Sequence, residues 1–128
     1  MLSWFRKNKK QTFREKFTLE ERKEQSRKLQ TKFPNHVFVI VSQDLFQNDD
    51  EKKNKFIISK TQTVAEFLSQ FRKHHSLKDD EAVFVFTERG TLPSNTQNME
   101  SLFANNRNED GFLYLSVSKE NTFGHKQK

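Results

Sequence analysis

Short apolar runs alternate with longer polar stretches along this chain, and most of the runs predict β-strands. Residues 36–41 (HVFVIV) are nearly continuously apolar and mostly β-branched, which is typical of a central strand buried on both faces. Further strands are predicted at residues 56–58, at residues 82–86 and from Phe112 to Val117, the last behind an Asp-Gly turn signal. The first two strands lie close enough in the sequence to pair as a hairpin with a long connection.

One amphipathic helix is predicted between the second and third strands. Thr63 and Glu66 have the spacing of a capping box, and apolar residues then recur at i, i+3, i+4 and i+7 up to Phe71. This helix is expected to end near His75 and to lie across the sheet with its apolar face inward. A shorter helical patch is indicated by Met99 and the two apolar residues that follow it at helical spacing, and a polar loop is expected from Asn105 to Asp110.

Another helix is predicted before the first strand. Thr18 and Glu21 form a second capping-box pair, and Pro34 stops the helical pattern, which runs to about Thr31. The apolar face of this segment is thin, so the helix is stable only if it lies against the rest of the protein. Its clearest anchor is Leu29, and three flanking aromatic residues would help to dock it: Phe13, Phe17 and Phe33.

The order of the main elements is strand, strand, helix, strand, short helix, strand. One amphipathic helix packed on a mixed four-stranded sheet is the arrangement of the ubiquitin-like β-grasp fold. We therefore predict an α+β protein of that class with an N-terminal helical extension. The expected division is a basic arm and helix over residues 1–34, the ubiquitin-like domain over residues 35–118 and a tail over residues 119–128.

Composition limits the alternatives. The chain has 128 residues, which is enough for one domain, and its fourteen phenylalanines predict an aromatic core. Cysteine is absent, which excludes disulfides and a thiol nucleophile and fits a reducing compartment. No apolar run approaches the roughly 20 residues of a membrane span, and the N-terminus lacks the apolar core of a signal peptide. Membrane association is therefore expected to be acquired.

The net charge of +6 is concentrated near the N-terminus. Residues 1–35 hold eleven Lys and Arg against four Glu, whereas the remaining residues are close to neutral. A basic segment can serve an anionic membrane, an acidic partner or nucleic acid, or can be a solvated helical face. Trp4 and Phe5 in the basic arm suit either a bilayer surface or packing on the domain. Nucleic acid is disfavoured because the few aromatic residues of this segment have no readable spacing.

The chain offers little catalytic chemistry of its own. No pair among its four histidines has a usual metal-ligand spacing, no catalytic triad can be proposed, and the three glycines are too far apart for a phosphate-binding loop. No enzymatic activity, metal or cofactor is therefore expected. Gly124 lies near the chain end, where no turn is required. It is either incidental to a frayed terminus or suited to a narrow cleft, with its carboxyl carbon open to attack.

Several segments resemble the autophagy ubiquitin-like modifiers, the family of the GABA-receptor-associated protein and the microtubule-associated light chain. The resemblance runs from about Thr12 to Gly124, with the segments in the order and at the separations of the family. It implies N-terminal helices in front of a β-grasp domain. The segments are Phe33-Pro34, Val39-Ile40-Val41, Lys55-Phe56, Phe71-Arg72-Lys73, Thr91-Leu92-Pro93, Glu109 to Tyr114 and Asn121 to Gly124.

The resemblance implies that other proteins act on Gly124. A cysteine protease would cleave between Gly124 and His125, next to Phe123, and remove residues 125–128. Activating and carrier enzymes would then pass Gly124 as a thioester on their own cysteines and join it to the amine of phosphatidylethanolamine. The implied role is in autophagosome formation, with a cytoplasmic location that changes to the autophagosome membrane after lipidation.

A peptide groove is expected along the second strand. If residues 56–58 form a sheet edge, they can pair with an extended peptide by β-augmentation. Cargo-receptor peptides that the family recognises carry an aromatic residue and an aliphatic residue three positions later. The two side chains point to opposite faces of the peptide strand, so two pockets are required. The resemblance places the aromatic pocket at Leu29, Phe38, Ile40, Lys55, Ile57 and Phe112, and the aliphatic pocket at Phe56, Ile58, Phe67 and Phe71.

Departures from the family pattern keep two other functions open. The resemblance assigns recognition by the processing enzyme to Arg72 and His74, and a neutral histidine makes a weaker charge contact than the family's arginine. One alternative is therefore an unconjugated ubiquitin-like adaptor that binds peptides. The basic N-terminal third leaves open another, a binder of cytoskeleton or nucleic acid. The other departures are Phe38 and Ser59 in place of proline, Gln25 in place of an acidic residue and His75 in place of an aliphatic one.

Overall fold

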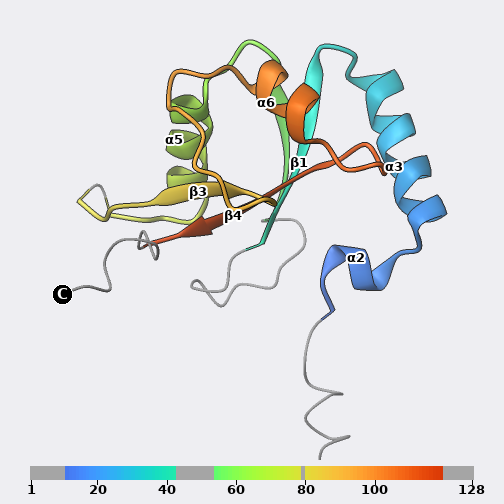
Figure 1. The fold of residues 1–128 in the computed structure, drawn as a ribbon, viewed down its shortest axis with the longest axis horizontal. Coiled ribbons are helices and arrows are strands. Elements are labelled where there is room, and N and C mark those ends of the chain that lie inside the picture. Colours follow the sequence, from blue (N-terminus) through green and yellow to red (C-terminus); the bar gives the residue numbers. More distant parts are fainter. Residues whose placement is uncertain (1–10, 43–53, 79, 120–128) are drawn as a thin grey trace, which may run out of the picture.

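A computed structural model describes residues 11–42, 54–78 and 80–119, and within them one mixed sheet is formed. Its strands are β1 (His36–Ser42), β2 (Lys55–Ser59), β3 (Phe84–Thr87) and β4 (Leu113–Ser118). Their order is β2-β1-β4-β3, with β1 antiparallel to β2 and parallel to β4, and β3 antiparallel to β4 (Figure 1). The predicted hairpin of the first two strands is confirmed, and β2 lies at one edge of the sheet.

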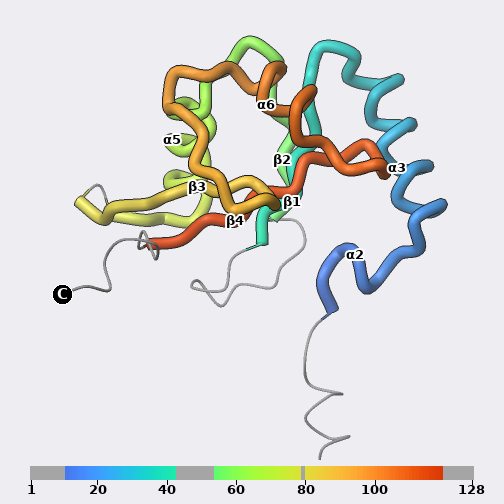
Figure 2. The backbone as a smooth tube through the Cα atoms, in the orientation of Figure 1, coloured from blue at the N-terminus to red at the C-terminus, as the bar shows by residue number. Residues whose placement is uncertain are grey.

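The helices lie on both faces of the sheet. Helix α5 (Val64–His74) and helix α6 (Met99–Asn106) cover one face, and together with the sheet they form the larger core. Helix α2 (Phe13–Lys16) and helix α3 (Leu19–Lys32) pack on the opposite face, as Figure 2 shows. The predicted α+β arrangement, with one helix across a mixed sheet and a helical extension before it, is confirmed. None of the helices in the described part of the chain is long and apolar enough to cross a membrane.

Capping side chains account for where the helices begin. Thr18 and Thr63 each accept a hydrogen bond from the backbone N–H three residues later, whose glutamate returns one, so both predicted capping boxes are confirmed. The same motif starts α2, which the pattern of apolar residues did not predict. Thr12 N–H donates to Glu15 Oε1 at 2.9 Å, and Glu15 N–H donates to Thr12 Oγ1 at 3.2 Å. A third Thr-x-x-Glu spacing was therefore the readable signal for this helix.

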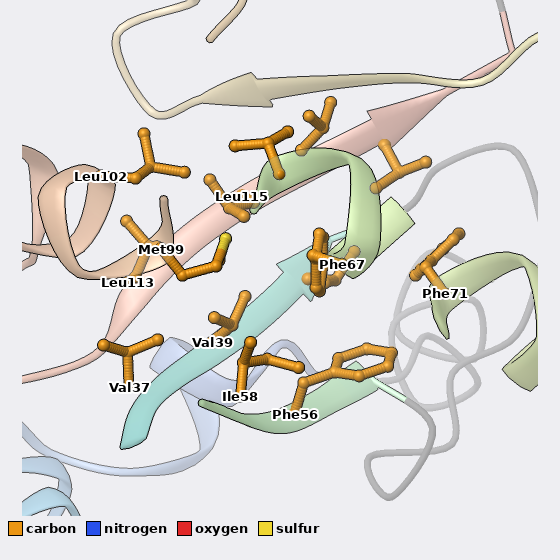
Figure 3. Close-up of a cluster of buried hydrophobic side chains, with 14 residues drawn as sticks. Val37, Val39, Phe56, Ile58, Phe67, Phe71, Met99, Leu102, Leu113 and Leu115 are labelled. Atoms are coloured by element: carbon orange, nitrogen blue, oxygen red, sulfur yellow. The ribbon is translucent and has the colours of Figure 1, made fainter. Parts of the chain in front are cut away.

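Strand β1 is buried on both faces, as predicted, and therefore separates two sets of side chains. Val37 and Val39 contribute to the larger core beneath α5 and α6, whereas Phe38 and Ile40 face α2 and α3. Figure 3 shows the larger core, where side chains from the sheet, α5 and α6 converge. The sheet thus lies between α5 and α6 on one face and α2 and α3 on the other.

Two predicted boundaries are wrong by a few residues. The third strand was expected over residues 82–86 but β3 begins at Phe84, because Phe84 pairs with Ser118, the last residue of β4. Among the described residues, no strand lies beside Ala82 and Val83. The loop expected from Asn105 onward begins later, since α6 runs to Asn106, whose Nδ2 donates to the Leu102 carbonyl at 3.1 Å. Trp4, Phe5 and most of the polar connection after β1 lie outside the described residues.

Candidate functional site

Strand β2 presents the edge that the sequence predicted. Its side chains alternate, with Phe56 and Ile58 buried and Ile57 37% exposed on the other face. Ile57 lies opposite Phe38 in the register with β1. An edge strand offers a row of backbone N–H and C=O groups to an incoming extended chain, so β2 can accept a peptide strand.

Most of the residues predicted for the aromatic pocket meet in one place. Leu29, Phe38, Ile40 and Phe112 lie together between the N-terminal helices and the sheet, although they come from separate segments. Phe38 and Phe112 are almost completely buried, at 2% and 0% exposure. We call this group the aromatic cluster. Its buried members are Phe13, Phe38, Ile40 and Phe112, and Phe17, Leu29, Phe33 and Tyr114 pack around them.

Phe13 is a member of the aromatic cluster that the predicted pocket did not include. Its ring is 7% exposed and meets the ring of Phe112 edge-on, with 5.2 Å between the ring centroids. The ammonium Nζ of Lys55 lies 5.1 Å from the centroid of Phe13, within cation–π range. Lys55 therefore joins the edge strand to helix α2 across the cluster. Lys55, which was predicted for the aromatic pocket, thus lies over an aromatic ring of this chain.

The four residues predicted for the aliphatic pocket belong to the larger core. Phe56 and Ile58 of β2 and Phe67 and Phe71 of α5 are between 0% and 5% exposed (Figure 3). The ring centroid of Phe56 lies 5.4 Å from that of Phe67 and 5.9 Å from that of Phe71. The ring of His74 also contacts Phe56, at 5.4 Å between centroids. In this structure the four side chains fill the space beneath α5.

A buried polar network ties α3 to the start of β4. Arg22 Nη1 donates to Asp110 Oδ2 at 2.6 Å, and the hydroxyl of Tyr114 donates to the same oxygen at 2.5 Å. Asp110 Oδ1 accepts from the Phe112 backbone N–H at 2.8 Å, so both carboxylate oxygens are satisfied. Burial, followed by the hydrogen bond to Asp110, raises the pKa of Tyr114 to about 12. Burial lowers the pKa of Arg22, but the hydrogen bonds to Asp110 and Tyr114 outweigh it and raise that pKa overall.

A close backbone contact lies beside this network. Ser26 Oγ donates to the Asp110 carbonyl at 2.5 Å, so α3 approaches the loop before β4 directly. Gly111, the next residue, has φ +94°, and a Cβ there would meet Ser26 Oγ and lie 2.9 Å from Ser26 Cβ. Only glycine allows both the backbone conformation and the approach of the helix. The docking of α3 therefore depends on this glycine.

Arg72 and His74, the predicted recognition positions for a processing enzyme, lie on α5. The Arg72 guanidinium donates to the backbone carbonyls of Lys78 at 3.1 Å and Glu81 at 2.6 Å, so it organises the connection after α5. Glu81 in turn pairs with Lys119 at 3.0 Å, just past the end of β4. The hydrogen bond from Lys119, followed by one from the Lys78 backbone, lowers the pKa of Glu81. Two side-chain contacts thus connect Arg72 to the start of the tail.

The residues of the predicted cleavage site, Phe123, Gly124 and His125, lie outside the described residues. Within the described ranges, no group of His, Cys, Asp and Glu side chains could hold a metal ion. A polar hollow of about 360 Å³ lies between the turn after β3 and the loop after α6. It contains none of the predicted site residues, and its lining is Glu88, Arg89, Asn105, Asn106, Arg107, Asn108 and Glu109.

Comparison with known proteins places this geometry in context. A family model described as "Autophagy protein Atg8 ubiquitin like" matches residues 21–124. Autophagy-related protein 8h of Arabidopsis thaliana is 34% identical over 116 residues, which cover 88% of this chain and 95% of that protein. Autophagy-related protein 8 of Kluyveromyces marxianus is 35% identical over 116 residues, which cover 90% of this chain and 93% of that protein.

A solved structure agrees with these relatives. The crystal structure of Trypanosoma brucei ATG8 superposes with a TM-score of 0.75 and covers 86% of this chain and 95% of that one, at 27% sequence identity. The match therefore includes most of this chain and nearly all of that one. Sequence and structure point to the same set of proteins.

Proposed function

This chain belongs to the Atg8 family of autophagy-related ubiquitin-like proteins, and from that membership we propose that it is a modifier processed at Gly124 and conjugated to phosphatidylethanolamine. Proteins of the family are modifiers and adaptors and not enzymes themselves, in agreement with the sequence prediction. The observation that carries the proposal is that the family match ends at Gly124, four residues before Lys128.

The proposed route leaves the chemistry to other proteins. A cysteine protease removes residues 125–128, and an activating enzyme and a carrier enzyme transfer the Gly124 carboxyl group as a thioester to the lipid amine. The two acyl chains, each stabilised by ~0.8 kcal/mol per buried CH₂, then hold the domain on the membrane. The protein is in the cytoplasm before conjugation and on the autophagosome membrane after it. On that membrane the domain recruits cargo receptors, and many copies on one membrane increase avidity.

The proposed receptor site is the edge strand β2, together with the aromatic cluster on one face of the sheet and the larger core on the other face. An aromatic-x-x-aliphatic peptide would add a strand beside β2, with its aromatic side chain toward the aromatic cluster and its aliphatic side chain toward Phe56 and Phe67. Ile57, exposed on the edge, and Lys55, which carries a positive charge beside it, support this arrangement. Lys55 also favours acidic residues next to the aromatic one.

The conjugation proposal is tested by the intact mass of the protein recovered from soluble and membrane fractions of cells with active autophagy. A soluble species that ends at Gly124 and a membrane species heavier by one phosphatidylethanolamine are expected. Gly124→Ala should keep the full-length mass and abolish the membrane species, whereas Lys126→Ala, within the removed segment, should be processed normally. A Gly124→Ala protein that still acquires the lipid would disprove the proposed site.

One observation favours a second function, that of an unconjugated peptide-binding adaptor. His74 is exposed at the end of α5 where relatives are expected to present arginine, so the contact with the processing enzyme is weakened. Recovery of only the full-length chain from both fractions would support this adaptor. His74→Arg should then restore cleavage by the processing protease, while Lys73→Arg, which keeps the charge next to it, should not.

A further inference from the structure

The aromatic cluster contains a residue that competes for the space of a bound peptide. We propose that Phe13 is a specificity-determining residue that limits the groove to small aromatic side chains and disfavours tryptophan. This inference rests on the proposed binding of aromatic-x-x-aliphatic peptides along β2. It concerns which of those peptides are accepted, and it comes from three observations on α2, β1 and β2.

The first observation is that the cluster is already filled by side chains of this chain. Phe13, Phe38 and Phe112 place three rings between α2 and the sheet, with exposures of 7%, 2% and 0%. Close-packed interiors resist extra volume, because inserted atoms force side chains out of their preferred rotamers. A ligand ring can therefore enter only to the extent that one of these three rings yields.

The second observation identifies the side from which a ligand ring would enter. Among the described residues, Ile57 is the most exposed apolar member of the predicted aromatic pocket, and it lies opposite Phe38 in the sheet register. Lys55, two residues before it on the same strand, extends to the ring of Phe13. A ring that passes over Ile57 therefore lies beside Phe38, and Lys55 on the same face of the strand connects this position to Phe13.

The third observation is that Phe13 is the ring with the least backbone support. Phe38 lies in the central strand β1, paired on both sides, and Phe112 directly precedes β4. Phe13 lies in a helix of four residues, held by its capping box and by the contacts of Arg14 with Glu88 and with the ring of Tyr114, 3.9 Å away. Phe13 is consequently the side chain that a large ligand must displace, and a benzene ring requires less displacement than an indole.

The test is a comparison of two synthetic peptides with the same acidic flanks, one with Trp-x-x-Leu and one with Phe-x-x-Leu. Their dissociation constants are measured by calorimetry on the full chain, and the readout is the ratio of the two constants. Because both peptides see the same preparation, a partly unfolded fraction does not change this ratio. Wild type should favour the Phe peptide, and Phe13→Ala should shift the ratio toward the Trp peptide by about tenfold.

Two further variants separate a change of pocket from a loss of stability. Phe13→Leu keeps an apolar anchor for α2 and should give an intermediate ratio. Phe103→Ala removes a half-buried phenylalanine that packs against the larger core on the other face of the sheet, so its ratio should equal that of wild type. An equal shift in Phe103→Ala and Phe13→Ala would overturn the inference.

The outcomes distinguish this inference from the function on which it rests. If the wild-type chain binds both peptides and Phe13→Ala leaves their ratio unchanged, Phe13 does not select the ligand and only the inference fails. If neither wild type nor any variant binds either peptide, the proposed groove fails and the inference fails with it. A wild-type preference for the Trp peptide would also contradict the inference.

Discussion

Arg22 Nη1 lies 2.6 Å from Asp110 Oδ2, which joins two residues 88 positions apart in the sequence. The Asp110 side chain has 0% exposure and that of Arg22 14%, so this ion pair is largely removed from water. It ties the N-terminal helical extension to the strand that enters the centre of the sheet. The extension is therefore part of the folded domain through a polar contact as well as through the aromatic cluster.

Replacement of Arg22 by methionine should destabilise the protein by about 3 kcal/mol, because it leaves a buried carboxylate without its cation. Arg27→Met is the matched control on the same helix, since Arg27 and Glu24 form an exposed pair with side-chain exposures of 67% and 44%. That control should cost no more than about 0.5 kcal/mol. Urea unfolding measures both changes, and equal losses would mean that the Arg22 pair contributes no more than a surface one.

Tyr114 should titrate with an apparent pKa of about 12, because burial and then the hydrogen bond to Asp110 favour the neutral phenol. It is the only tyrosine in the chain, so tyrosinate absorbance reports it directly. In the urea-unfolded protein the pKa should return to roughly 10. In Asp110→Asn it should fall between these values, since burial remains. A native pKa near that of the unfolded chain would contradict the buried hydrogen bond.

The same shift determines how stability depends on alkaline pH. The folded-state pKa is above the unfolded value, so the neutral phenol stabilises the fold fully below roughly pH 10. This contribution is lost as the pH rises toward the folded-state pKa of about 12. Tyr114→Phe, which removes the titrating group, should therefore show a shallower loss of stability over that range than wild type.

Gly111→Ala should destabilise the protein considerably more than Gly90→Ala. Both glycines have positive φ, +94° and +85°, so alanine is strained at either position by about 1 kcal/mol. A Cβ at Gly90 would meet nothing within 4 Å, whereas one at Gly111 would collide with the side chain of Ser26. The collision should add about 1–3 kcal/mol. Thermal unfolding of the two variants measures the difference. Similar losses of stability would show that α3 can move away from residue 111 without a further loss of stability.

Ser76→Gly should stabilise the protein by about 0.5–1 kcal/mol. Ser76 follows α5 with φ 55°, the left-handed conformation that glycine adopts most easily at a helix end. Ser69→Gly, at an exposed position inside α5, should instead destabilise by about 0.5 kcal/mol. Chemical unfolding of both variants checks the opposite signs, and a loss of stability in both would mean that Ser76 has a role beyond its backbone conformation.

Local sequence signals predicted most individual elements. The capping boxes at Thr18 and Thr63 placed the starts of α3 and α5 because the interacting groups are only three residues apart. The apolar run at residues 36–41 predicted a strand buried on both faces for a similarly local reason. The boundary of β3 was missed because β3 begins opposite the last residue of its antiparallel partner β4, and that residue lies more than thirty positions away in the sequence.

The predicted aromatic pocket shows where sequence reasoning stops. Family resemblance identified Leu29, Phe38, Ile40 and Phe112, and the structure brings all four together. It did not place Phe13 in the pocket. The sequence predicted only that this ring helps to dock the N-terminal helix, because residue type cannot say which cluster a ring joins. The position of Phe13 depends on how α2 packs, which the helix's own residues do not specify.

The sequence by itself determined three of the helices, α3, α5 and α6, together with the strands, the edge hairpin and the membership of the family, since these follow from short-range spacing and from ordered motifs. The tertiary structure alone decided which groups meet across long sequence separations. Arg22 with Asp110, Ser26 with Gly111, and Phe13 with Lys55 are such pairs. Each pair forms because packing of the two helices against the sheet removes water from both partners, and no local pattern encodes that event.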